Sequence, residues 1–115
     1  MGFPNFSKGN KMDKSKNYTF GFWSVKIGKE TEFITAWESF AKWTMLNQSG
    51  TEGDAQLVQD INEPLHFVSF GAWEGIQHVQ EWRNCLEFKA FFNQARELCT
   101  DTRPVTMKHV ASAVR

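Results

Sequence analysis

The strands and helices of this chain are marked by a change in the spacing of its large apolar residues. In HFVSFGAWEGIQHVQEWRN, residues 66–84, these side chains alternate up to Trp73 and then fall about every third position. Alternation is typical of a β-strand, and the wider spacing is typical of a helix. The stretch therefore predicts a strand over residues 65–73 and then a short helix that carries Ile76, Val79 and Trp82.

The first half of the chain shows the same two patterns. A strand is predicted over NYTFGFWSVKIG, residues 17–28, and a helix over residues 29–46 with acidic side chains in its first turn, where the helix dipole favours them. A polar loop over residues 47–53 then leads to a second strand, residues 54–62. That strand ends before Pro64, because proline cannot donate to a strand ladder.

The C-terminal part adds one more helix and one more strand. The helix carries apolar residues at helical spacing, namely Phe88, Phe91, Phe92, Ala95, Leu98 and Cys99. Pro104 then opens a last strand over VTMKHVASAV, residues 105–114. The resulting order predicts an α+β fold, a ferredoxin-like split β-α-β sandwich with a four-stranded antiparallel sheet and helices on one face.

The predicted strands are apolar on both faces. The first strand places Tyr18, Phe20 and Phe22 on one face and Gly21, Trp23 and Val25 on the other. Helices of the same chain cover only one of these faces. We therefore expect a second, identical subunit to cover the other, so that the protein is a homodimer.

Length and charge narrow the functional classes. With 115 residues the chain predicts one domain, residues 17–115, preceded by a flexible arm, residues 1–16, that is rich in Gly, Ser, Asn and Lys. The charges of thirteen basic and thirteen acidic side chains cancel, which disfavours nucleic acid and anionic membranes as partners.

The cysteines and the apolar runs indicate the compartment. Cys85 and Cys99 form no CxxC pair, so we expect reduced thiols. No apolar run is long enough for a signal peptide or a membrane span, so we expect a cytoplasmic protein.

The aromatic content provides the candidate site. The chain has 11 Phe and 5 Trp, and Trp73 lies at the strand-to-helix junction on the face expected to meet the helices. We interpret Trp73 and Ser69 as the residues that would serve chemistry, Ser69 or Thr19 by a hydrogen bond to a phenolic oxygen. The pocket wall is expected to comprise Trp23, Trp37, Phe67, Gly21, Phe88 and Phe92. Each of these side chains could equally fill the core.

Other kinds of site find no support in the motifs. His66, His78 and His109 fall on separate elements without metal-ligand spacing, so no metal site is predicted. Neither a nucleophile motif nor a glycine-rich phosphate loop is present. Gly21 and Gly71 leave gaps in the sheet that either make room for a ligand or receive Trp37 or Phe40 from the helix.

At the level of motifs the sequence resembles the antibiotic biosynthesis monooxygenase domain. The resemblance rests on Gly28-Lys29-Glu30, FITAW, FVSFGAWEG and VQEWRNCLEFKAFFNQAREL, and it runs from Tyr18 to Val110. It implies a dimeric α+β barrel and an oxygenation that uses O₂ without metal or flavin. In that reaction a fused-ring phenol binds in an apolar pocket, loses its proton, passes an electron to O₂ and becomes a quinone.

Two other interpretations stay open. The chain could bind or sense a small aromatic compound without turning it over. Relatives of similar fold degrade haem with an asparagine, a tryptophan and an iron-binding histidine, whose positions here fall on Gly21, Trp73 and Phe92, so only the tryptophan is retained. The quinone-forming relatives place tyrosine and arginine in their pockets. The single tyrosine here is Tyr18, and Arg83 and Arg96 lie on the predicted helices without a match to the arginine position.

Overall fold

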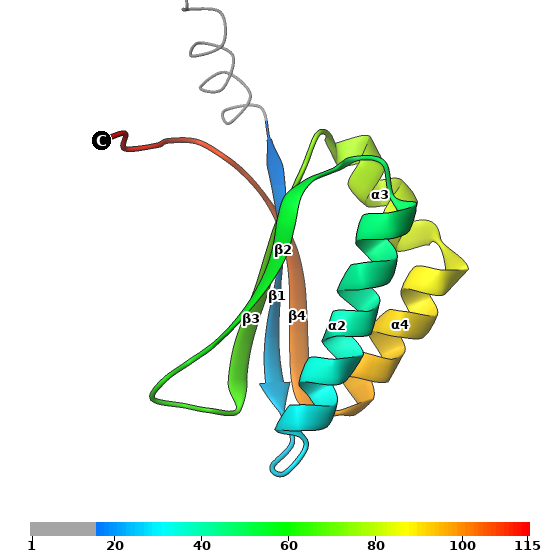
Figure 1. Ribbon diagram of the computed structural model, residues 1–115, viewed down its shortest axis with the longest axis vertical. Coiled ribbons are helices and arrows are strands. Elements are labelled where there is room, and N and C mark those ends of the chain that lie inside the picture. The colour runs from blue at the N-terminus through cyan, green and yellow to red at the C-terminus, as the bar shows by residue number, and fades with distance from the viewer. Residues whose placement is uncertain (1–15) are drawn as a thin grey trace, which may run out of the picture.

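The computed structural model describes residues 16–115, which form a four-stranded sheet and three helices. The elements are β1 (Asn17–Val25), α2 (Glu30–Asn47), β2 (Thr51–Gln59), β3 (His66–Trp73), α3 (Ile76–Asn84), α4 (Leu86–Glu97) and β4 (Cys99–Lys108). All strand pairs are antiparallel in the order β2-β3-β1-β4, and the helices lie on one face of the sheet (Figure 1). The predicted ferredoxin-like α+β fold is confirmed.

The two central strands set the faces of the sheet. β1 and β3 pair so that Thr19 lies opposite Gly71 and Gly21 lies opposite Ser69. Because side chains alternate along each strand, these four residues and Trp73 share the face toward the helices, as predicted. The central pair therefore brings the predicted site residues of both strands to one surface.

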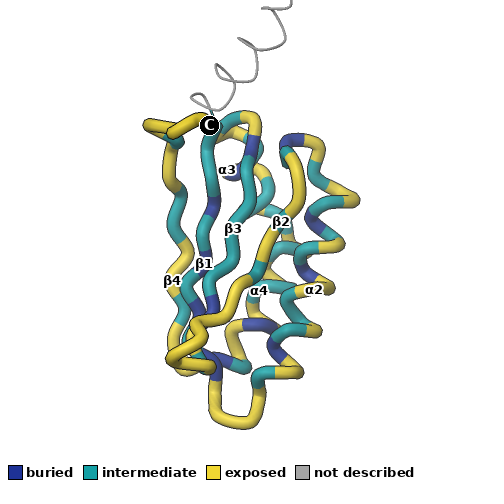
Figure 2. The backbone as a smooth tube through the Cα atoms, turned by 60° about the vertical axis from the view of Figure 1, so that its left-hand side comes forward, coloured by how far each residue is buried: buried dark blue, intermediate teal, exposed yellow. Residues whose placement is uncertain are grey.

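The core lies between this face and the helices. Its buried members are Trp23, Val25, Phe33, Phe67, Ala95 and Cys99. Phe33, from the first turn of α2, is fully buried and lies 5.1 Å from both Trp23 and Phe67, measured between ring centroids. Figure 2 shows the buried positions along β1 and on the helices, and exposed backbone around the turn between β2 and β3.

β2 differs from the prediction at both ends. It begins at Thr51, inside the predicted loop, and ends at Gln59. Its pairing with β3 shifts register between Glu52 and Gln56, and Gly53 in this segment has φ +67°, a conformation that favours glycine. The irregular backbone interrupts the alternation of side chains, so the start of this strand has the sequence pattern of a loop.

β4 also differs from the prediction. α4 ends at Glu97 and the strand begins at Cys99, which pairs with Val25, so Pro104 lies within the strand rather than before it. Proline is tolerated there because β4 is an edge strand and needs no donor on its outer side. The strand ends at Lys108, and residues 109–115 continue without regular structure.

The structure describes the C-terminal end of the chain but little of the predicted N-terminal arm. The predicted arm over residues 1–16 lies outside the described residues except for Lys16, whose Nζ is 3.0 Å from Oε1 of Glu52. The C-terminal segment leaves β4 toward the side of the sheet that carries no helix (Figure 1). Within residues 16–115, no helix combines the length and the apolar character that a membrane span needs.

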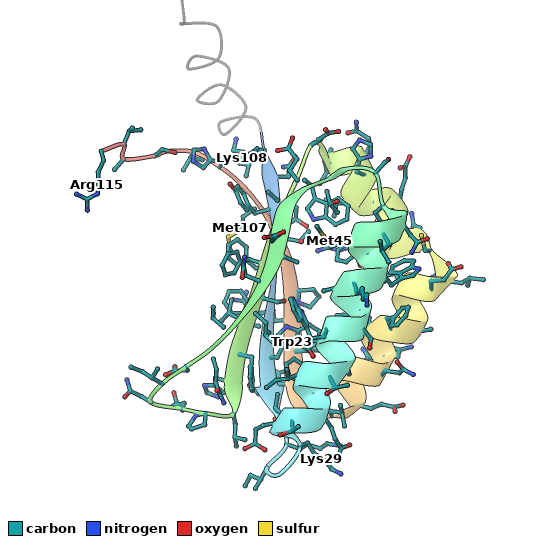
Figure 3. All side chains as sticks on the ribbon, viewed as in Figure 1. Trp23, Lys29, Met45, Met107, Lys108 and Arg115 are labelled. Atoms are coloured by element: carbon teal, nitrogen blue, oxygen red, sulfur yellow. The ribbon has the colours of Figure 1, made fainter. Side chains whose placement is uncertain are left out.

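The second face of the sheet is apolar, and within residues 16–115 no helix covers it. Phe20 stacks on Phe22 and Phe70, with ring centroids 6.3 and 5.7 Å apart, and Arg103 lies over the Phe22 ring at 4.9 Å. Met107 lies on this side of the sheet, opposite to Trp23 and Met45 (Figure 3). The prediction of two apolar faces is therefore correct for the chain itself.

Candidate functional site

A cavity of about 80 Å³ lies between the sheet and the helices, at the end of the sheet where β3 leads into α3. All four strands and all three helices contribute to its wall. Of the predicted site residues, seven line it: Gly21, Trp23, Trp37, Ser69, Trp73, Phe88 and Phe92. The structure therefore brings nearly all of the predicted set together.

Trp73 lines the cavity and is buried. Its side chain is 2% exposed, its ring centroid is 4.8 Å from that of Trp82, and its indole N–H donates a 3.0 Å hydrogen bond to Oγ1 of Thr19. A buried indole needs such a partner because an unpaired buried donor costs about 1–3 kcal/mol. Trp73 is thus both a core residue and a wall of the cavity, the two roles that the sequence left open.

Trp23 and Ser69 form a second pair of this kind. The indole N–H of Trp23 donates to Oγ of Ser69 at 3.0 Å. A Cβ atom on Gly21 would lie 2.7 Å from Nε1 of Trp23 and 2.8 Å from Oγ of Ser69, so this pair occupies the gap that the glycine leaves. The gap at Gly21 receives a neighbour in the sheet, not Trp37 or Phe40 from the helix.

A third pair was not predicted. The indole N–H of Trp82 on α3 donates to Oγ1 of Thr44 on α2 at 2.9 Å, and both residues line the cavity. Trp82 also packs edge-on against Phe88, with ring centroids 4.7 Å apart. The helical spacing of Trp82 showed that it faces inward, but it held no sign of a threonine 38 residues earlier.

These three pairs give the wall a common chemical property. Thr19, Thr44 and Ser69 each accept a hydrogen bond from an indole, and within residues 16–115 none of their hydroxyl groups donates one. A hydroxyl group has one hydrogen to donate in addition to its acceptor sites. The cavity is thus apolar around aromatic rings and carries three hydroxyl donors that a ligand oxygen can use.

Phe67 and Gly71 differ from the residues above in their surroundings. Phe67 is 2% exposed in the core beside Phe33 and does not line the cavity, so the structure places it apart from the predicted pocket wall. A Cβ atom on Gly71 would meet only Ala55, at 3.8 Å. The space at Gly71 is open and belongs to the cavity.

Charged groups occur in the wall as well. Glu52 and Asp54 of β2 and Arg83 of α3 line the cavity. Glu52 is paired with Lys16, and Asp54 is exposed. Burial lowers the pKa of the Arg83 guanidinium, because the removal of water disfavours its charged form. The sequence showed Arg83 on a helix but did not show which way its side chain points.

The histidines and cysteines lie away from the cavity. Cys85 and Cys99 form no disulfide in the structure. Burial raises the pKa of Cys99 to about 11 although nearby Lys26 opposes the shift, which leaves this thiol unreactive near neutral pH. None of the three histidines is part of the cavity wall.

One group of potential metal ligands among residues 16–115 combines a histidine with two carboxylates. The side chains of Asp60, Glu63 and His66 offer ligand atoms within 4.8 Å of one another at the turn between β2 and β3. All three residues are exposed, and the Asp60 carboxylate accepts hydrogen bonds from the backbone of Asn62 and Glu63, which shapes the turn. The strand register places this turn at the opposite end of the sheet from Trp73.

Known proteins resemble this chain in sequence family and in fold. A family model described as antibiotic biosynthesis monooxygenase matches residues 19–94. None of the curated proteins matches the chain. Among solved structures, a conserved protein from Methanosarcina mazei is 18% identical with a TM-score of 0.77, covering 86% of this chain and 97% of its own.

SnoaB, a cofactor-independent oxygenase from Streptomyces nogalater, is 14% identical with a TM-score of 0.76 and covers 85% of this chain and 96% of its own. A protein from Shewanella oneidensis is 19% identical with a TM-score of 0.70, covering 81% and 89%. At these identities the likeness to the solved structures is one of fold.

Proposed function

Because the chain belongs to the antibiotic biosynthesis monooxygenase family, of the dimeric α+β barrel superfamily, we propose that it oxidises a phenolic or quinol-type aromatic substrate with O₂ and without a metal or flavin. The observation that carries this proposal is the cavity itself. Aromatic rings line it, and the hydroxyl groups of Thr19, Thr44 and Ser69 in its wall have a hydrogen to donate.

The chemistry of such a reaction suits this wall. The substrate loses a proton, its anion passes an electron to O₂, and the two radicals combine to a peroxide that breaks down to a quinone. The substrate loses the hydrogen of its phenolic hydroxyl group and one hydrogen of a ring carbon. That carbon gains one oxygen atom of O₂ as a carbonyl, and the second oxygen atom leaves with the two hydrogens as water. Hydroxyl donors fixed at the wall would stabilise the anionic oxygen in surroundings from which water is excluded.

The size of the cavity restricts how a substrate enters. Its volume of about 80 Å³ is small beside the ~300–1,000 Å³ of pockets that enclose drug-sized ligands. Met45 on α2 lies between that helix and the sheet (Figure 3) and contributes to the wall. A methionine side chain bends easily, so we expect it to move when a molecule of two or more rings binds.

Dissolved O₂ and tryptophan fluorescence, followed together in metal-free buffer, test this function. Anthrone, a naphthalenediol and a hydroquinone serve as candidate substrates, and we expect O₂ uptake with at least one of them. Ser69→Ala removes a donor from the wall and is expected to lower the rate about tenfold or more, by analogy with the loss of an oxyanion donor. Quenching without O₂ uptake would instead support the alternative function, a binding or sensing protein.

A matched control separates chemistry from stability. Thr102→Val removes a strand hydroxyl group that is outside the cavity wall and has no hydrogen-bond partner, so it should leave the rate unchanged. Equal rates for the wild type, Ser69→Ala and Thr102→Val would contradict the role given to Ser69. Titration with haem addresses the haem alternative, which predicts a shifted Soret band.

The uncovered sheet face supports a homodimer as the working form of the protein. Phe20, Phe22 and Phe70 form a stacked aromatic surface, and the C-terminal segment leaves the sheet on that side (Figure 1). A second copy packed there would remove these rings from water. Light scattering should give a dimer mass, and Phe20→Asp should give a monomer; a monomeric wild type at micromolar concentration would contradict the assembly.

A further inference from the structure

Arg83 differs from Arg96 and Arg103 in having no partner. It lies in the last turn of α3, directly after Trp82, and is half-buried in the cavity wall. Arg96 lies 6.0 Å from the centroid of the Phe92 ring, and Arg103 lies 4.9 Å from that of Phe22. Within residues 16–115, Arg83 makes neither a hydrogen bond nor an ion pair nor a ring contact.

The position of Arg83 in the last turn of α3 explains only part of why this side chain lies in the cavity wall. A cation is favourable in the last turn of a helix because of the helix dipole, but that interaction is satisfied equally well by an exposed side chain. Arg96 occupies the last turn of α4 and is exposed. The position of Arg83 in the cavity wall therefore has a cost in lost hydration that the dipole alone does not require.

The other charged groups of the wall do not offset that cost. Glu52 is paired with Lys16 at 3.0 Å, and their charges cancel. Asp54 is exposed, so water and salt screen its charge. Neither carboxylate forms an ion pair with Arg83. What remains at the cavity is one partly desolvated cation next to aromatic rings.

We propose that Arg83 selects an aromatic ligand that carries a carboxylate beside its ring, and that it binds this group by a charge-assisted hydrogen bond. The planar guanidinium matches the two oxygens of a carboxylate, and a bound anion would offset the hydration that Arg83 has lost. The inference rests on the proposed function because both concern the same cavity. The substrate class that it adds is that of aromatic acids with a phenolic hydroxyl group.

Pairs of ligands that differ only in charge test the proposal. The probes are hydroxybenzoate and hydroxybenzamide, and hydroxynaphthoate and hydroxynaphthamide, titrated at neutral pH with tryptophan fluorescence and dissolved O₂ followed together. In each pair the ring and the phenol are the same, and one member has a carboxylate where the other has a neutral amide. We expect the acid of at least one pair to bind about tenfold more tightly than its amide, and this preference to weaken as salt increases.

Three variants connect the preference to Arg83. Arg83→Gln should remove most of the preference for the acid, and Arg83→Lys should keep part of it because the charge remains without the planar fork. Arg96→Gln is the matched control: it also replaces an arginine in the last turn of a helix, but outside the cavity, and should leave the preference unchanged. Thermal unfolding confirms that each variant is folded before it is compared.

The outcomes distinguish this inference from the oxygenase proposal. A preference for the acid that Arg83→Gln abolishes supports the inference whether or not O₂ is consumed. Equal affinity of acid and amide in the wild type overturns it, even if O₂ uptake shows that the oxygenase proposal is correct. A preference that survives Arg83→Gln, or no binding of any of the four probes up to millimolar concentration, also overturns it.

Discussion

The two ends of the interior are both aromatic. At the filled end, rings close on the fully buried Phe33, although Phe67 also borders an open groove between α2 and β2. At the hollow end, a cavity remains beside Trp82. Around Phe33, the rings of Trp23 and Phe67 lie at 5.1 Å and the side chain at the centre is fully buried. Around Trp82, rings lie just as close, at 4.8 Å to Trp73 and 4.7 Å to Phe88, yet a cavity remains beside them. Close ring packing is therefore compatible with an internal space.

Small residues and hydrogen bonds account for the hollow end. Gly71 and Ala55 leave the sheet side of the cavity without bulky side chains. The indoles of Trp73 and Trp82 are held by their bonds to threonine hydroxyls, so they do not turn to fill the space. We expect the filled end to supply stability, and we propose that the hollow end binds the ligand.

The largest expected effect on stability comes from emptying the filled end. Phe33→Ala should lower the free energy of unfolding by about 3–5 kcal/mol, because it creates a cavity in a fully buried position. Phe88→Ala is the counterpart at the hollow end, where the ring already borders a cavity and is partly exposed, and about 1–3 kcal/mol is expected. Urea unfolding at one fixed protein concentration measures both. Equal losses would show that the two ends are packed alike.

Two glycine variants are expected to change the free energy of unfolding less than Phe33→Ala does, and in opposite directions. Gly21→Ala forces a methyl group against the Trp23–Ser69 pair and should destabilise by about 1–3 kcal/mol. Gly71→Ala meets only Ala55 at 3.8 Å and should stabilise by about 0.5–1 kcal/mol, since glycine within a strand is unfavourable.

The same two variants separate stability from binding. The methyl group of Gly71→Ala enters the cavity, so this variant should bind aromatic ligands more weakly while it unfolds at higher urea. Fluorescence titration and urea unfolding of the same samples provide both values. If Gly71→Ala bound as tightly as the wild type, the ligand would have to lie elsewhere.

The site shows which features strand alternation predicts and which it does not. Alternation along two strands was enough to predict that Gly21, Trp23, Ser69 and Trp73 face the helices, and all four line the cavity. Phe67 has the same parity, yet it lies nearer the other end of β3 and belongs to the filled core. Parity determines the face of a sheet but not the position along it at which a helix leaves space.

The sequence by itself determined the fold class, the faces of the strands and the inward side of each helix, because these follow from spacings of two and of three to four residues. Tertiary structure decided which indole bonds which hydroxyl, since Trp73 and Thr19 are 54 residues apart. It also decided the start of β4 at Cys99, set by pairing with Val25, and the direction of Arg83. Such contacts depend on how separate elements pack, and no local spacing records them.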